Sequence, residues 1–368
     1  MARHLAGWRV VLGLSIAMGG WACTPPQPPP VPPTIPTPKV EPAESTSLKA
    51  PAPVEPERPT EAPPLMLSPS KATLLPGDPG LQLLVSGPDE SGGRRDCTGE
   101  MAWSVEPAGI LAIEPGGYVR AIGPGVATIR GTTNGRDVAG TVEVAPTSGG
   151  DRPWDFGEDI APLFTRLGCN TGGCHAKAEG QNGFHLSLFG YDPEGDYRSI
   201  VRDAGGRRVS PLSPTASLLL TKATGRSIHG GGQRIAPGSE AERRISEWLA
   251  SGAPEHRGEG HGRLVRAVVE PGNVRLDQPG HQRFRVIAEY EDGHRRDVTR
   301  LASFRSNDDS VVEVDAMGRA VILRRGEADL IVRYQSKVVS VRVASKINPN
   351  LAFDFDALPR RNVIDEKL

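Results

Sequence analysis

Short runs of alternating apolar and polar residues occupy two separate parts of the chain. In residues 65–146 they include LQLLVSG, MAWSV, VATIRGT and GTVEVAP, separated by turn sequences such as LPGDPG, EPGG and GPG. Residues 263–346 show the same pattern, as in FRVIAEYEDGHRRDVT. Alternation with a period of two is typical of half-buried strands, and many short strands between turn signals predict a β-sandwich. We therefore expect one small sandwich in each part.

The period changes in residues 152–256, between the two β regions. The apolar residues at its start follow helical spacing and predict an amphipathic helix over 156–167 that ends at Gly168; they are Phe156, Ile160, Leu163, Phe164 and Leu167. Near the other end, Ser239 and Glu242 form a capping box, an apolar stripe follows, and Gly252 supplies a stop signal. This pattern predicts a mainly α-helical module between the two sandwiches.

The two β regions repeat each other. RAVVEPGNVRLDQPG corresponds to LMLSPSKATLLPG, and FRVIAEYEDGHRRDVT corresponds to LQLLVSGPDESGGRRDCT. At these residues the chain resembles group 2 bacterial immunoglobulin-like domains, which recur in surface proteins as spacers and sometimes as adhesive modules.

Cys97 stands where the second repeat has Val298, so we expect Cys97 to be a buried free thiol. Asn307, Asp308 and Asp309 lack the ladder of oxygen ligands of a calcium site and predict a turn.

Composition and charge fit several small modules on linkers. The 368 residues include 44 Gly and 35 Pro with only 5% aromatic residues, which argues against one large core. Residues 24–64 are almost wholly Pro, Thr, Glu, Ala and Val, and predict a disordered spacer. The net charge of -1 offers no basic surface for nucleic acid. No nucleophile elbow, phosphate loop or HExxH motif appears, so the sequence predicts no catalytic residues.

Residues 1–23 have the pattern of an export signal. A positive start is followed by an apolar run from Val10 to Met18 that is too short to span a bilayer. The small residues in GGWA before Cys23 resemble a bacterial lipoprotein cleavage site, which predicts Cys23 as a lipidated residue and a lipid anchor in the membrane. Simple secretion is the alternative. We expect a protein of the outer membrane or cell surface, with the periplasm as the alternative.

The stretch Gly168–His175, GCNTGGCH, is the strongest chemical motif. Two thiols followed at once by a histidine have the order used for covalent haem attachment, although the common spacing is C-x2-C-H and this one is C-x4-C-H. The motif predicts haem c bound to Cys169 and Cys174, with His175 as the proximal iron ligand. The alternatives are a disulfide between the two cysteines, which an oxidising compartment permits, and a zinc site.

A second iron ligand is predicted at His229. The central segment contains no methionine, and His229 lies in IHGGGQRI, where glycines let the backbone approach a flat macrocycle closely. His185, in a short extended segment, is the runner-up. His256 and His261 lie in a predicted linker, and His281 and His294 lie beside turn signals.

A resemblance extends this prediction. The runs DIAPLFTRLGCNTGGCHAKAEGQNGFHLSLFGYDPEGDYRSIV and GRRVSPLSPTASLLLTKATGRSIHGGG resemble the cytochrome c-like region of exported proteins abundant in planctomycetes. That family carries the C-x4-C-H spacing and combines the region with immunoglobulin-like repeats and two long domains, and it usually has Gly where this chain has Ala176. The resemblance implies one covalent haem for electron transfer with an unidentified redox partner. In the tail, residues 347–368, Asp354 and Asp356 predict a strand-like connector.

Taken together, these features predict a multidomain exported protein that carries haem. The alternative is a non-enzymatic adhesion or scaffold protein, bound to a cell-surface polysaccharide or protein, whose central module is held by a Cys169–Cys174 disulfide.

Overall fold

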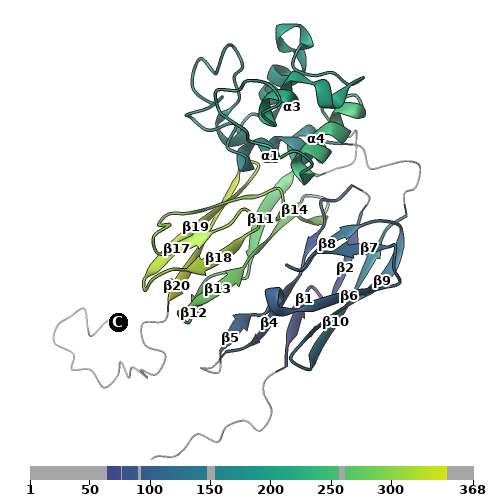
Figure 1. Ribbon diagram of the computed structural model, residues 1–368, viewed down its shortest axis with the longest axis vertical. Helices are drawn as coiled ribbons and strands as arrows, with labels where there is room; N and C mark the ends of the chain where they lie inside the picture. Colours follow the sequence, from purple (N-terminus) through teal and green to yellow (C-terminus); the bar gives the residue numbers. More distant parts are fainter. Residues whose placement is uncertain (1–63, 76, 90–92, 147–153, 257–261, 346–368) are drawn as a thin grey trace, which may run out of the picture. The chain divides into compact units, whose positions relative to one another are not determined.

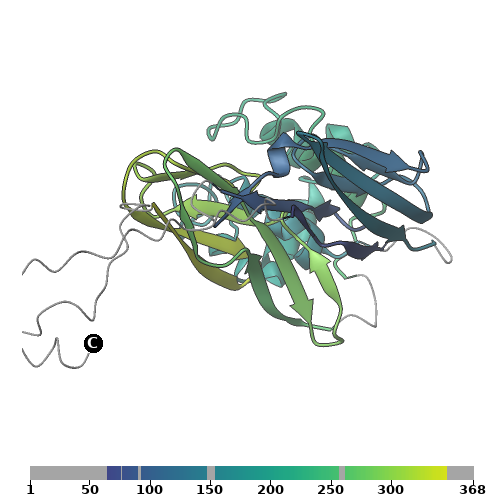
Figure 2. The same cartoon turned by 90° about the horizontal axis from the view of Figure 1, so that it is seen from below.

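The computed structural model describes residues 64–75, 77–89, 93–146, 154–256 and 262–345. The predictions for the leader with Cys23, the Pro-rich spacer up to residue 63, His261 and the tail with Asp354 and Asp356 lie outside these residues. Within them the chain is mainly β-sheet, and the α-helices lie in the central segment, drawn in teal and green in Figures 1 and 2.

The first β region contains three sheets. Their strand orders are β1-β4-β5, β2-β10-β9-β6 and β3-β8-β7. Alternate residues of β9 and β10 are buried, as the period of two predicts for strands with one face in a core. The strands are β1 (Met66–Ser68), β2 (Lys71–Leu74), β3 (Leu81–Gln82), β4 (Leu84–Pro88), β5 (Arg94–Asp96), β6 (Ala102–Glu106), β7 (Leu111–Ile113), β8 (Tyr118–Ala121), β9 (Gly125–Thr133) and β10 (Arg136–Val144).

The second β region has the same sheets in the same order. They are β11-β14-β15, β12-β20-β19-β16 and β13-β18-β17, and in both regions the second strand pairs in parallel with the last. The internal repeat seen in the sequence is therefore a repeat of topology (Figure 1). The strands are β11 (Leu264–Glu270), β12 (Val274–Leu276), β13 (Gly280–Arg283), β14 (Arg285–Tyr290), β15 (Arg295–Asp297), β16 (Ser303–Ser306), β17 (Val312–Val314), β18 (Arg319–Ile322), β19 (Glu327–Tyr334) and β20 (Lys337–Ser345).

The central segment is rich in turns and contains only short helices. Its α-helices are α1 (Ala161–Arg166), α2 (Pro193–Tyr197), α3 (Leu218–Ala223) and α4 (Glu240–Ala250), the last with 11 residues. Two π turns, Phe156–Ile160 and Arg198–Arg202, and three 3-10 turns, Leu188–Gly190, Asp203–Gly206 and Pro214–Ala216, account for the other helical residues.

The prediction of a mainly α, cytochrome c-like module is therefore wrong. Helical periodicity covers only the two ends of the segment, and many of the glycines between them have positive φ, a conformation that ends helices. The fold that the structure describes is mainly β, with a central segment of turns and short helices.

The ends of the central segment pack on each other. The backbone N–H of Phe156 donates to the Glu255 carbonyl at 3.0 Å. The fully buried Trp248 of α4 lies with its ring centre 5.6 Å from that of Phe156, and its Nε1 donates to the Pro254 carbonyl at 2.9 Å. The capping box forms in a modified way, since Ser239 Oγ accepts from the Glu242 N–H while the Glu242 carboxylate accepts from the Gly238 N–H at 2.7 Å. The two helical stretches predicted at the ends of the segment thus pack on each other within its core.

The two β regions exchange equivalent hydrogen bonds. Asp96 of β5 accepts from the Thr98 N–H at 2.8 Å and, with its other oxygen, from the Arg283 N–H of the second region at 2.7 Å. Asp297 of β15, the matching residue of the second repeat, accepts from the Thr299 N–H at 2.9 Å and from the Gln82 N–H of the first region at 2.8 Å. Both aspartates are buried.

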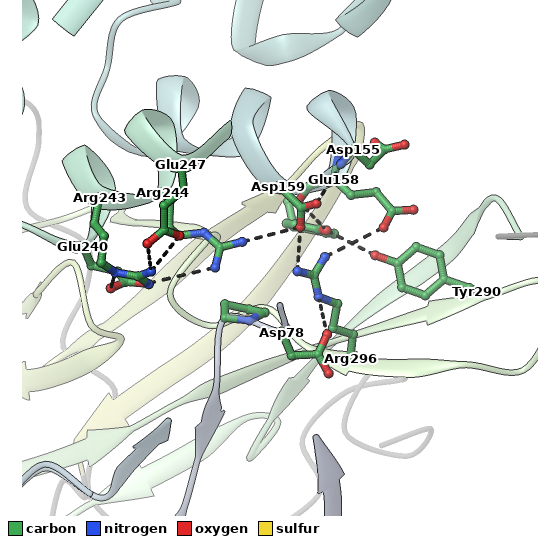
Figure 3. Close-up of polar contacts among 12 residues, drawn as sticks. Asp78, Asp155, Glu158, Asp159, Glu240, Arg243, Arg244, Glu247, Tyr290 and Arg296 are labelled. Atoms are coloured by element: carbon green, nitrogen blue, oxygen red, sulfur yellow. Dashed lines mark hydrogen bonds and ion pairs between the residues drawn. The ribbon is translucent and has the colours of Figure 1, made fainter. Parts of the chain in front are cut away.

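A buried arginine joins all three parts of the folded chain (Figure 3). Arg296 of β15 donates from Nη2 to Asp159 of the central segment at 2.6 Å, and its Nε lies 3.1 Å from Asp78 Oδ1 of the first β region. The side chains of Arg296 and Asp159 are each only 1% exposed. Arg244 of α4, also buried, reaches the same Asp159 oxygen at 3.5 Å. Each of the three parts therefore supplies at least one charge to a single desolvated cluster.

Candidate functional site

The cysteine–histidine loop begins where α1 ends. Gly168 has φ +74, and the Cys169 N–H donates back to the Phe164 carbonyl at 2.8 Å, as in a glycine-terminated helix. The His175 N–H donates to the Cys169 carbonyl at 3.0 Å and closes the loop. The helix end therefore fixes both cysteines and the histidine on one compact turn.

The two cysteines of this loop have different surroundings. Both are free thiols in the structure. Burial raises the pKa of the Cys169 thiol to about 12, so its thiolate is disfavoured at neutral pH. Cys174 is half-buried, and Arg234 Nη2 lies 4.0 Å from its Sγ. Cys97 is also a free thiol, buried in a small core with Val85, which confirms that prediction.

The sequence predicted a metal-binding protein. This prediction is wrong for a metal ion that would be held only by protein side chains. Within the described ranges no three His, Cys, Asp or Glu side chains gather in an arrangement that would hold a metal ion, which also removes the zinc alternative. The mainly β fold, in turn, corrects the description of the chain as a cytochrome c-like fold.

His175 and His229, more than fifty residues apart in the sequence, lie side by side. Their ring centres are 6.2 Å apart and their ring planes are parallel within 8°. His175 Nδ1 lies 3.0 Å from the Phe184 carbonyl oxygen, and His229 Nδ1 lies 2.7 Å from the Gly232 carbonyl oxygen. Because a carbonyl only accepts, each Nδ1 carries a proton, and in the neutral form of each ring the lone pair is on Nε2. In the described part of the chain neither Nε2 has a hydrogen-bond partner.

The separation of the two ring centres matches that of two imidazoles that would share one metal ion. At about 2 Å per metal–nitrogen bond, such a pair has its ring centres roughly 6 Å apart. Burial lowers the pKa of the His175 imidazole and so favours the neutral form that can bind a metal. A haem supplies four ring nitrogens of its own, so two protein ligands suffice for it. The residues present therefore fit haem, with His175 and His229 as the ligands and the two thiols beside them.

A second layer of contacts holds His175 in place. Buried Asp196 accepts from the Ser187 N–H at 2.5 Å and from its hydroxyl at 2.8 Å, and thereby fixes the stretch that presents the Phe184 carbonyl to His175. Burial raises the pKa of the Asp196 carboxyl to about 6. Arg208 covers the Phe184 ring at 4.8 Å. Fixing the Nδ1 acceptor in this way sets the direction of Nε2.

The loop around His229 depends on glycine. A Cβ at Gly231 would lie 3.1 Å from His229 Cε1, and Gly232, which supplies the carbonyl for Nδ1, has φ +69. Lys222 Nζ donates to the Ile228 carbonyl at 2.8 Å and ties the start of the loop to α3. Glycine here permits close approach of the backbone to the imidazole.

The other histidines do not join this pair. His185 is exposed, so the runner-up ligand faces solvent. His256 is exposed and lies 3.8 Å from Asp155, His281 is half-buried in β13, and the backbone N–H of His294 donates to Asp292 in a turn. Residues 307–309 form a turn, as predicted: Asn307 Oδ1 accepts from the Asp329 N–H at 2.8 Å and Asp308 from the Ser310 N–H at 3.0 Å.

Sequence reasoning missed the buried charge cluster. Asp159 reads as an ordinary acidic residue in a first helical turn, and Arg296 as one arginine of the run HRRD. The matching run of the first repeat places Arg95 on the surface beside Glu100. No signal in the sequence separates the two arginines.

Comparisons with known proteins add weak structural likenesses. No family model and no curated protein matches the chain. Domains 5–6 of the S-layer protein SbsC share 11% identity with a TM-score of 0.30, covering 77% of this chain and 98% of that one. A larger fragment, rSbsC(31–844), gives 11% identity and a TM-score of 0.20, and the chain spans only 23% of its length. Human protocadherin-24 EC1-2 shares 9% identity with a TM-score of 0.17, covering 78% of this chain and 99% of that one.

Among the described residues no helix is long and apolar enough to cross a membrane.

Proposed function

We propose that this protein is a non-enzymatic structural protein displayed at the cell surface. The observation that carries the proposal is the buried cluster of Arg296, Asp159 and Asp78, which takes its charges from three parts of the chain. A change that removes one of these groups and leaves the others buried without a partner would cost several kcal/mol, so the cluster favours one fixed arrangement of the three parts. The core of the central segment is also continuous with that of the second β region. These contacts support a rigid body built to hold a fixed shape.

The surface location of this scaffold rests on the leader and can be tested through Cys23. We expect the wild-type protein in the membrane fraction of its native cells, and accessible to proteinase K added to intact cells. Cys23→Ser removes the thiol that the lipid would modify and should move the protein to the soluble exported fraction. Cys97→Ser, which changes a buried core thiol, is the control and should leave fractionation unchanged. Unchanged fractionation of Cys23→Ser, or complete protection from the protease, would contradict the proposal.

A second function is favoured by the imidazole pair. We propose that His175 and His229 hold the iron of a haem attached at Cys169 and Cys174. The parallel rings at 6.2 Å, each with Nε2 left open, support this proposal. When bound, such a group would supply a one-electron couple. The chain itself orients both rings through backbone carbonyls and keeps His175 neutral.

Substitution of His229 tests this cofactor. The full chain, expressed with a c-type maturation system, should give a haem-stained band on a denaturing gel and a low-spin visible spectrum. His229→Ala should keep the covalent band but lose the low-spin α and β bands, because one imidazole ligand is gone. His185→Ala, which removes an exposed imidazole outside the pair, should leave both unchanged. Absence of a covalent haem band in the wild type would reject this second function.

A further inference from the structure

A groove of about 440 Å³ lies away from the imidazole pair, between the central segment and the second β region. Its volume falls in the range of roughly 300–1,000 Å³ typical of small-ligand sites. Its lining includes Tyr191, two residues before α2, and Glu194 of α2. It also includes Gln335 and Ser336 of the turn between β19 and β20, and Lys337, the first residue of β20. The groove therefore combines an aromatic ring with several polar side chains.

The aromatic ring of this groove is exposed on a fixed backbone. Tyr191 is 81% exposed. On its C-terminal side, Asp192 caps α2 by accepting from the Gly195 N–H at 3.0 Å, and the Asp192 N–H donates to Ser187 Oγ at 3.0 Å. A large ring that gains nothing from burial, yet is held in place by its neighbours, is suited to stack on a flat partly apolar ligand.

The polar side chains are uncommitted. Within the described residues Glu194, Gln335 and Lys337 have no side-chain hydrogen bond or ion pair, whereas Glu255 on the same groove pairs with Arg202 at 2.9 Å. The charged residues that line the groove have both signs: the carboxylates of Asp155, Glu158, Glu194 and Glu255, and the cations of Arg263 and Lys337. The groove therefore offers both donors and acceptors.

The β19–β20 turn departs from its sister turn in a way that supports a binding role. The first repeat uses Asn134 and Gly135, with φ of 48 and 73, the residues that a tight hairpin prefers. The second repeat places Gln335 there, with φ +50, followed by Ser336. A residue less suited to the left-handed conformation costs stability, and such costs concentrate at functional sites. The substituted turn is the one that lines the groove.

We propose that this groove binds one or two units of a neutral saccharide. Sugars present flat C–H faces that stack on aromatic rings, and hydroxyl groups that pair with carboxylate, amide and ammonium side chains. The groove supplies one exposed ring, Tyr191, and an acid, an amide and an amine around it. The inference rests on the proposed surface location only for the source of the saccharide, which would be a polymer at the cell surface.

Isothermal titration of the purified full chain tests the site without reference to localisation. The probes are chitotetraose, cellotetraose, maltotetraose and mannotetraose. At least one should bind, and Tyr191→Ala should weaken that binding by about tenfold or more because the stacking surface is removed. Leu212→Ala, which truncates a fully exposed apolar side chain outside the groove, is the control and should bind like the wild type.

A second variant separates binding from folding. Gln335→Asn with Ser336→Gly restores the turn residues of the first repeat, so thermal stability should stay equal or rise. Saccharide affinity should nevertheless fall, because the amide shortens and the hydroxyl is lost. The proposal is overturned if none of the four probes binds, or if binding is unchanged in Tyr191→Ala.

Discussion

Replacing Arg296 by methionine should destabilise the folded chain by about 3–5 kcal/mol, the cost of leaving buried partners without their counter-charge. Asp159 and Asp78 would remain desolvated, with Arg244 the nearest remaining cation at 3.5 Å from Asp159. The loss should appear in all three parts at once, because each supplies a member of the cluster. Calorimetry of the wild type should show one cooperative transition, and the Arg296→Met transition should occur at a markedly lower temperature.

The neighbouring arginine provides a matched control. Arg295 lies on the same strand, but its side chain is 58% exposed and makes surface ion pairs with Glu289 and Glu270. Arg295→Met should therefore cost no more than about 1 kcal/mol. Equal effects of the two substitutions would show that the buried cluster does not join the parts, and would remove the observation on which the scaffold proposal rests.

The substitution Asp297→Ala should lower the free energy of unfolding by roughly 2–5 kcal/mol, because it leaves the backbone N–H groups of Thr299 and Gln82 without acceptors. The matching change, Asp96→Ala, removes the acceptor of the Thr98 and Arg283 N–H groups and should have a similar cost. The expected similarity follows from the reciprocal arrangement of the two regions. Chemical denaturation of each variant measures both costs.

A turn aspartate serves as the control for these two variants. Asp315 also accepts two backbone N–H groups, those of Met317 and Arg319, but it is exposed and lies within one region. Water can replace it, so Asp315→Ala should have a much smaller effect. A large cost for Asp297→Ala with none for Asp96→Ala would contradict a reciprocal contact between the regions.

The sequence anticipates the local elements better than the tertiary contacts. Period-two alternation places the strands, and the capping residues Ser239 and Gly168 mark where α4 begins and α1 ends, because these signals act over a few residues. The mainly α prediction for the central segment failed because two periodic stretches at its ends were extended across a glycine-rich middle. In that middle part the spacing of apolar residues does not indicate secondary structure. The turns there are set by the backbone conformations of glycine and proline.

Long-range pairing is the part that local patterns do not encode. Arg95 and Arg296 occupy the same place in two copies of one motif, yet one is exposed and the other is buried, because only the second meets Asp159. In the candidate site, the order of residues at Cys169, Cys174 and His175 suggested a partner for His175 elsewhere in the segment. The structure brings His229 to it, although the carbonyls that orient both rings have no signature in the sequence.

The exchange between Asp96 and Asp297 has the form of an isologous contact, in which equivalent groups on two copies bind each other. Contacts of this kind close on themselves, whereas head-to-tail contacts leave an unused face at each end and can propagate into filaments. Because both copies are carried on one chain, their self-complementary faces are consumed within the molecule. Any array that this protein joins must therefore grow through other surfaces, and the pair of β regions acts in it as a closed unit of fixed size.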